Sequence, residues 1–217
     1  MGNDITDTSA RALSVAEEAK GIKRSFRLFM NGVAAQSMRD KGLCYKVIWG
    51  IPVTRIQTMA SEHEPDCELA TLLWQSDVRE CKLLAMMLMP TDGCDEAMAL
   101  SWVGACNNTE MAEQIVFSLL QRLPCACGLA VRLLRSDDKW AQVCAFHLVS
   151  RLAVKGIGLT DDEAVSRLAR MAASAISGSD AVLRHAAFNC VTRYVDRGLR
   201  GADLLVSELK NREIGIF

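Results

Sequence analysis

The sequence has little proline, no excess of charge of one sign and no long apolar run. Four prolines and 14 glycines in 217 residues exclude a collagen-like chain and argue against disorder rich in these two residues. The longest uninterrupted apolar stretch, Leu83 to Met89, is far shorter than the roughly 20 residues that a membrane-spanning helix needs. The start of the chain lacks the basic and then apolar pattern of a signal peptide. We therefore expect a cytoplasmic globular protein without a membrane partner.

The formal net charge of −1 excludes a chain that is basic throughout, but the charges are unevenly distributed. Residues 1–50 carry 8 basic and 5 acidic residues, residues 51–114 carry 3 and 11, and residues 115–217 carry 14 and 10. Two basic ends therefore flank an acidic middle. The basic ends are compatible with a nucleic-acid partner. The acidic middle argues against a protein wrapped by DNA along its whole length, and it offers a surface to a protein partner.

The standard motifs of enzymes and metal sites are lacking. The sequence contains no G-x-S-x-G elbow, no P-loop and no H-E-x-x-H pair. Its nine cysteines are odd in number and mostly embedded in apolar runs, such as those around Cys81, Cys106, Cys144 and Cys190. This pattern is typical of small buried hydrophobic residues in a reducing compartment, not of a disulfide framework. We expect neither a metal nor a cofactor.

Apolar residues recur at helical spacing in several windows, whereas the alternation of a β-strand is rare. In the window 180–197, six residues fall on one helical face: Leu183, Ala186, Ala187, Cys190, Val191 and Tyr194. The pattern predicts helices over 8–19, 22–40, 52–61, 66–75, 78–89, 95–105, 109–122, 125–135, 138–154, 160–177, 180–197 and 200–211. Because the connections are short, we expect an all-α, HEAT-like α-solenoid of antiparallel helix pairs, in a single helical-repeat domain over residues 1–217. A compact orthogonal helical bundle is the alternative.

Turn and capping residues separate the expected helices. Lys155–Gly158 ends one helix, where a glycine supplies the left-handed backbone of a helix C-terminus. The segment Thr160–Glu163 has the pattern of a capping box that begins the next helix. Ser177–Asp180 forms another turn, in which Asp180 is placed to cap the helix that follows.

Two basic stripes are the features most indicative of a partner. Residues of the first stripe are spaced i, i+3, i+4 and i+7, and those of the second are spaced i, i+4 and i+8: Lys20, Lys23, Arg24 and Arg27, then Asn189, Arg193 and Arg197. Gly21 interrupts the first stripe if it breaks the helix. A polar flank usually faces solvent. The alternative is contact with DNA phosphates along one side of a solenoid.

Four stretches carry a family resemblance. They are the run L-W-Q-S-D-V-R-E-C-K-L-L-A from Leu73 to Ala85, Met38-Arg39 followed by Gly42, the segment from Tyr45 to Ile56, and Asp138–Trp140. These stretches resemble AlkD-like DNA alkylation repair proteins, the HEAT-like alkylpurine DNA glycosylases. The likeness extends over roughly residues 22–197, and its most specific part is the L-W-x-S-x-x-R-E run.

The resemblance implies a curved helical solenoid that binds duplex DNA on a concave, basic face. In active members of the family, aromatic side chains and one carboxylate line this cleft. They stabilise the positive charge on the alkylated base and its sugar while the glycosidic bond breaks, without moving the base into a pocket.

The family's pattern has an aromatic residue at the start of one helix and a carboxylate four residues later. The corresponding positions here are Thr109 and Glu113. The second aromatic corresponds to Asn189, and an arginine that follows the Trp140-like position corresponds to Gln142. The carboxylate is thus kept as a glutamate, while both aromatic positions have changed. An acidic residue such as Glu113 near a helix N-terminus is also favoured simply by the helix dipole.

We therefore predict a HEAT-like repeat protein that binds duplex or distorted DNA through its phosphates and has reduced or absent base excision. One alternative is an active alkylpurine DNA glycosylase that uses Glu113 as its catalytic carboxylate and Trp140 or Trp102 as the aromatic. Another is a protein-binding helical scaffold, which would use the acidic middle segment.

Overall fold

The computed structural model describes residues 3–215, with side chains from residue 11 onward. Across the described residues the chain forms twelve α-helices, two short 3-10 turns and one isolated parallel bridge between Val47 and Val78. The prediction of an all-α protein is confirmed. The chain divides into two compact units, Met1–Cys94 and Asp95–Phe217. That it works as a single helical-repeat domain stays a prediction. No helix in the described part of the chain has both the length and the apolar character needed to cross a bilayer.

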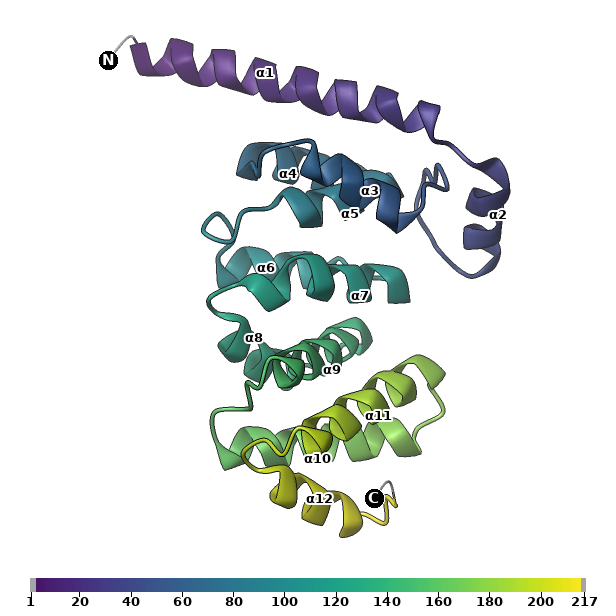
Figure 1. Cartoon of the computed structure of the whole chain (residues 1–217), viewed down its shortest axis with the longest axis vertical. Helices are drawn as coiled ribbons and strands as arrows, with labels where there is room; N and C mark the ends of the chain where they lie inside the picture. The colour runs from purple at the N-terminus through teal and green to yellow at the C-terminus, as the bar shows by residue number, and fades with distance from the viewer. Residues whose placement is uncertain (1–2, 216–217) are drawn as a thin grey trace. The chain divides into compact units, whose positions relative to one another are not determined.

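The first unit contains five α-helices (Figure 1). They are α1 (Asn3–Ser25), followed by the 3-10 turn η1 (Phe26–Leu28), α2 (Gly32–Asp40), α3 (Val53–Ser61), α4 (Cys67–Trp74) and α5 (Arg79–Leu88). Helix α5 packs against α3 and α4, and α1 packs against α4. Apolar side chains from these helices and from the loop before α3 are fully buried, among them Ile51, Leu69 and Leu84.

The expected helix over 22–40 is wrong. Helix α1 continues through Gly21 to Ser25, and a second helix begins only at Gly32. A glycine inside a helix costs about 1 kcal/mol relative to alanine, which the buried residues Ala19 and Ile22 on either side offset. The side chain of Asn31 begins α2, because its oxygen accepts a hydrogen bond from the backbone N–H of Ala34 at 3.0 Å.

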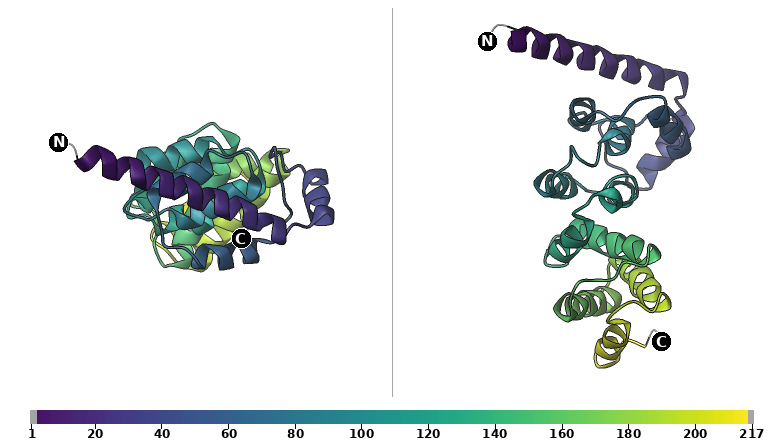
Figure 2. Two further views of the ribbon diagram at one scale, coloured as in Figure 1. Left: turned by 90° about the horizontal axis from the view of Figure 1, so that it is seen from above. Right: turned by 60° about the vertical axis from the view of Figure 1, so that its left-hand side comes forward.

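The second unit contains the remaining seven α-helices. They are α6 (Glu96–Gly104), α7 (Thr109–Ser118), followed by the 3-10 turn η2 (Leu120–Arg122), α8 (Ala126–Leu133), α9 (Lys139–Val154), α10 (Asp162–Ser177), α11 (Ala181–Asp196) and α12 (Ala202–Lys210). Contacts join α6 to α7, α8 to α9 and α10 to α11, as expected for helix pairs. Helix α9 also packs against both α7 and α11, so these three helices form one continuous layer (Figure 2).

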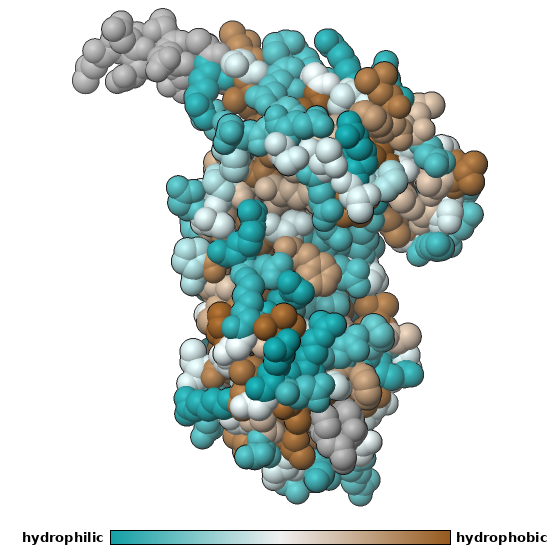
Figure 3. Space-filling view, in the orientation of Figure 1, coloured by the Kyte–Doolittle hydropathy of each residue, from teal (hydrophilic) through white to brown (hydrophobic). Residues whose placement is uncertain are grey.

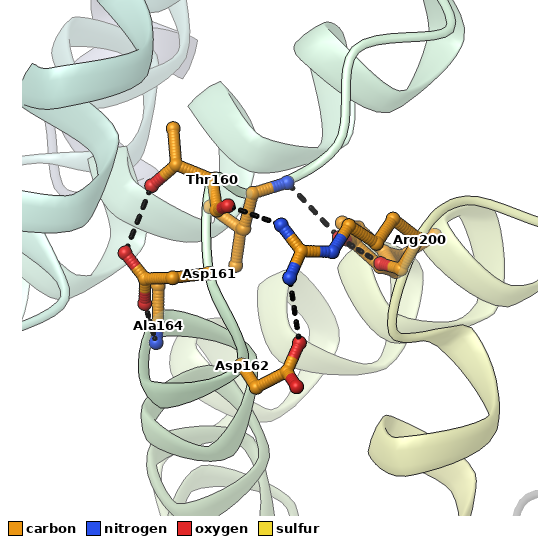
Figure 4. A network of polar contacts seen from close by, with 7 residues as sticks. Thr160, Asp161, Asp162, Ala164 and Arg200 are labelled. Atoms are coloured by element: carbon orange, nitrogen blue, oxygen red, sulfur yellow. Dashed lines mark hydrogen bonds and ion pairs between the residues drawn. The ribbon is translucent and has the colours of Figure 1, made fainter.

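The helix boundaries in this unit lie at the predicted capping residues, except that the cap of α10 is one residue later than expected. Gly156 has the left-handed backbone expected after α9, with a φ of 76°. The residue that caps α10 is Asp161, not Thr160, since its carboxylate accepts the backbone N–H of Ala164 at 2.7 Å. Thr160 instead donates its hydroxyl to Asp161 at 3.0 Å (Figure 4). Arg200, from the loop before α12, donates to the Thr160 carbonyl and to Asp162, and so holds this turn in place.

The R-E pair of the L-W-x-S-x-x-R-E run is buried in the first unit. Glu80 is fully buried, and its carboxylate accepts backbone N–H groups from Trp49 at 3.1 Å, Gly50 at 3.1 Å and Ile51 at 3.3 Å. The Arg79 guanidinium, which is 1% exposed, donates to the Ile51 carbonyl at 2.8 Å and to Glu80 at 2.9 Å. Two charged side chains thereby fasten the loop before α3 to the start of α5.

The same loop also fixes the start of α2. The backbone N–H of Asn31 donates to the Trp49 carbonyl at 2.8 Å. Gly50 has a φ of 77°, and a Cβ atom there would collide with the Asn31 carbonyl and lie 2.7 Å from the Ala35 nitrogen. Only glycine fits this left-handed and crowded position. The buried pair of α5 therefore supports the connection between α1 and α2 through this loop.

Candidate nucleic-acid interface

The first basic stripe lies in the first unit and is only partly helical. Lys20, Lys23 and Arg24 are on the last turns of α1, whereas Arg27 lies in η1. Lys20 forms an exposed ion pair with Glu17 at 2.7 Å, and Lys23 is half-buried. Arg24 and Arg27 are exposed. The spacing thus predicted a shared helical face correctly for three of the four residues.

The second stripe lies on α11, in the second unit. Arg193 donates to the hydroxyl of the buried Ser150 on α9, at 3.0 Å. Asn189 donates its amide to the ring nitrogen Nε2 of His185 at 2.9 Å. Arg197 is exposed at the C-terminus of α11. The first two side chains are therefore positioned by their neighbours, and the third is open to solvent.

Residues spaced four apart along α7 and η2, along α9 and along α11, including the residue that directly follows each of the last two helices, form one surface, which we call the α7–α9–α11 face. It comprises Thr109, Glu113, Phe117 and Gln121, then His147, Arg151 and Lys155, then His185, Asn189, Arg193 and Arg197. Side-chain contacts join the first two series. Arg151 donates to the Gln121 side chain at 3.0 Å and lies over the Phe117 ring at 5.3 Å from its centroid. Lys155 donates to the Gln121 carbonyl at 2.7 Å.

The α9 cations of this face, Arg151 and Lys155, were not among the residues singled out from the sequence. His147, Arg151 and Lys155 repeat at i, i+4 and i+8, the same spacing that singled out Asn189, Arg193 and Arg197. This signal was present in the sequence. It becomes meaningful only once α9 is known to pack between α7 and α11.

A pocket of about 220 Å³ opens on this face around Glu113. Its lining comes from all three helices: Thr109, Glu113, His147, Ala181, Val182, His185 and Ala186. Glu113 thus lies in a pocket to which α11 contributes four residues. No phenylalanine, tyrosine or tryptophan lines this pocket.

The structure does not bring Trp102 or Trp140 to the pocket around Glu113. Trp102 is 4% exposed within the core of the second unit. Trp140 lies in the first turn of α9, where the Lys139 ammonium sits 4.8 Å from its ring centroid. Neither residue lines the pocket. The two aromatic residues considered as partners of Glu113 therefore contact other parts of the second unit and do not reach its carboxylate.

Burial shifts the pKa values of two groups in the pocket. The pKa of Glu113 is raised, because desolvation of its carboxylate outweighs the favourable effect of His185, and the neighbouring Glu110 adds to the rise. The pKa of His147 is lowered to about 4, first by burial and then by His185 and Arg193. His147 is therefore a neutral imidazole at physiological pH.

The lowered pKa of His147 predicts a pH dependence of stability. The unfolded chain binds a proton at this residue below a pH of about 6.5, while the folded protein does not until about pH 4. The free energy of unfolding should therefore fall, by up to about 3 kcal/mol, as the pH drops through this window. Urea denaturation from pH 4 to pH 7 measures it, and His147→Gln should remove this part of the decline.

The matched control is His63→Gln, which removes a histidine from the other unit. Its side chain contacts Glu18 at 2.8 Å and is not part of the α7–α9–α11 face. This variant should keep the decline due to His147. A difference between wild type and His147→Gln that stays constant from pH 4 to pH 7 would contradict the prediction.

The described side chains hold no group of three or more histidine, cysteine, aspartate or glutamate residues placed to bind a metal ion. All nine cysteines are free thiols, and Cys81, Cys106, Cys144 and Cys190 are buried as predicted. The face thus combines cations, amides and imidazoles with one carboxylate, Glu113, and one exposed aromatic ring, Phe117, which lies outside the pocket lining.

Comparison with known proteins identifies a family and a fold. A family model described as DNA alkylation repair enzyme matches residues 11–191. A solved structure from work on "a new family of proteins related to the HEAT-like repeat DNA glycosylases with affinity for branched DNA structures" has a TM-score of 0.73 and 15% identity, and covers 90% of this chain and 83% of that chain. The similarity confirms the predicted HEAT-like helical fold over the orthogonal bundle. No curated protein sequence matched.

Proposed function

The chain belongs to the DNA alkylation repair enzyme family, and on that premise we propose that it binds duplex or distorted DNA through the phosphates without excising bases. The α7–α9–α11 face carries this proposal. Four cations, Arg151, Lys155, Arg193 and Arg197, lie on it with a single carboxylate, Glu113. Contacts of this kind hold the DNA backbone and read its shape, not its base sequence.

We propose branched DNA as the distorted form that is preferred. The structurally similar protein has affinity for branched DNA structures, and its likeness to this chain covers most of both. At a branch, phosphates of more than one arm come close together, which raises the local density of negative charge. A cationic layer supplied by adjacent helices is suited to such a surface.

The walls of the pocket argue against excision of alkylated bases. When a glycosidic bond breaks, positive charge develops on the sugar, and an ionised carboxylate and aromatic faces stabilise that charge. The pocket supplies one carboxylate, Glu113, whose pKa is raised by burial, but it supplies no aromatic face. Thr109 and the small apolar residues Ala181 and Ala186 occupy the positions beside it.

A binding and excision experiment tests the proposal. The protein is titrated against a four-way junction and a linear duplex of the same length at several salt concentrations. Four phosphate contacts predict a log–log slope of about −3.6, since each contributes about −0.9. In parallel, DNA methylated at N3 and N7 of purines is incubated with the protein, and free base is expected at the spontaneous rate.

The possible outcomes separate the three candidate functions. Binding that does not change with salt would contradict phosphate contact. Release of methylpurine above the spontaneous rate, lost in Glu113→Gln, would replace the proposal with an active glycosylase. Co-purification with another protein and no affinity for DNA would favour a protein-binding scaffold.

A further inference from the structure

Four large apolar side chains are exposed where α1 is joined to α2. Leu28 is 80% exposed, Phe29 36%, Met30 61% and Val33 84%. We call these four residues the apolar corner. Figure 3 shows hydrophobic atoms at the surface of α2, beside hydrophilic ones. Single exposed apolar residues are common on proteins, but four large ones within six residues of the chain favour a surface that contacts a partner.

The apolar corner is part of an ordered connection. Phe26 precedes it and is fully buried, and the backbone N–H of Phe29 donates to the Phe26 carbonyl at 3.1 Å. Asn31, within the corner, is tied to Trp49 by the hydrogen bond described above and caps α2 with its side chain. Hydrogen bonds thus order the backbone that carries the exposed apolar side chains.

Arg55 fixes the aromatic ring of the corner. Its guanidinium lies 4.0 Å from the centroid of the Phe29 ring, and it also lies 3.8 Å from the Glu62 carboxylate. A cation at this distance from the ring face is attracted by the ring electrons. The Phe29 ring is therefore already ordered before binding, so that a partner that contacts it causes little further loss of side-chain entropy.

The segment of the chain that carries the corner is basic. Between residues 24 and 46 there are five basic residues and one acidic residue. The acidic residue, Asp40, accepts a hydrogen bond from Gln36 at 2.8 Å. Arg24 and Arg27 lie directly before the corner and are exposed. A second copy of this chain would bring like charges together, whereas a nucleic acid supplies both phosphates for the cations and base faces for the apolar residues.

We propose that the apolar corner is a wedge that inserts between base pairs at a branch point of DNA. Leucine, phenylalanine and methionine are among the side chains that proteins use to unstack a base step. The bases that flank a branch are already less well stacked, so that insertion costs less there than in a linear duplex. This inference rests on the proposed function and adds to it the element that selects branched over linear DNA.

The experiment uses the full chain and a four-way junction with 2-aminopurine beside the branch point. Fluorescence of this base rises when it leaves the stack. Wild type should raise it, and the double variant Leu28→Ser with Met30→Ser should not. The variant should also bind the junction about tenfold more weakly, as expected for lost burial of apolar side chains, and bind linear duplex as wild type does. Phe29 is retained because it contacts Arg55.

The matched control is Leu13→Ser, which removes another exposed leucine, 67% exposed, from α1. It should behave as wild type in both measurements. Unchanged fluorescence and affinity in the double variant, with normal junction binding by wild type, would overturn the wedge alone. A wild-type protein that binds no DNA would overturn both proposals.

Two further outcomes would assign the corner to another occupant and overturn the wedge. In light scattering after gel filtration, a wild-type dimer that the double variant converts to a monomer would identify a second copy. Binding to anionic phospholipid vesicles that the double variant loses, with junction binding unchanged, would identify a lipid surface.

Discussion

Glu80→Ala is expected to lower the free energy of unfolding by about 3–5 kcal/mol, which is the range for breaking a buried ion pair. The substitution removes the carboxylate partner of the buried Arg79 guanidinium. It also removes the acceptor for the backbone N–H groups of Trp49, Gly50 and Ile51. The substitution thus leaves four polar groups without this acceptor: the Arg79 guanidinium and the three backbone N–H groups. Each buried polar group that loses its partner lowers the free energy of unfolding. Urea denaturation followed by circular dichroism measures the effect.

Two other variants make this result interpretable. Glu80→Gln keeps an acceptor oxygen but loses the charge, so its loss of stability should lie between wild type and Glu80→Ala. Glu17→Ala removes a glutamate from an exposed ion pair with Lys20, and it should leave the unfolding free energy nearly unchanged. If Glu80→Ala and Glu17→Ala had equal effects, the buried pair would not fasten the loop as described.

The sequence predicted the helices well where periodicity and capping agree. Asp180 and Gly156 mark boundaries that the structure confirms, because a cap side chain or a left-handed glycine acts within a few residues. The role of Arg79 and Glu80 was not predictable in this way. Both are charged residues, a type that is almost never fully buried unless it is paired. Only the approach of a loop 30 residues earlier in the chain explains why they are buried.

Part of the candidate interface was singled out from the sequence, and its role in binding stays a prediction. Glu113 and Arg193 were recognised, one from the family resemblance and one from its spacing, and the structure places them on the same face. The α9 cations Arg151 and Lys155 were missed because charged residues four apart look like any polar flank of a helix. Its meaning depends on which helices pack side by side, and that is set by contacts between residues distant in the sequence.

Substitution of both Arg193 and Arg197 by glutamine should give the largest change in DNA binding. Each arginine that contacts a phosphate contributes about 0.9 to the salt slope, so the double variant should reduce the slope by about 1.8. Arg193 is the better positioned of the two, because its bond to the buried Ser150 fixes the guanidinium on the α7–α9–α11 face. Its loss therefore removes a preorganised contact, and the loss of Arg197 removes a contact that is ordered only on binding.

The control must remove the same charge from another surface. Arg132→Gln with Arg167→Gln does this, since Arg132 pairs with Glu96 on the surface of α8 and Arg167 pairs with Glu163 on α10. Both double variants have the same net charge, so long-range attraction to DNA is lowered equally in the two. A slope that falls by the same amount in each would mean that DNA responds to the overall charge of the protein. A fall confined to Arg193 and Arg197 would mean that phosphates contact α11, because only direct neutralisation releases counterions at a defined site.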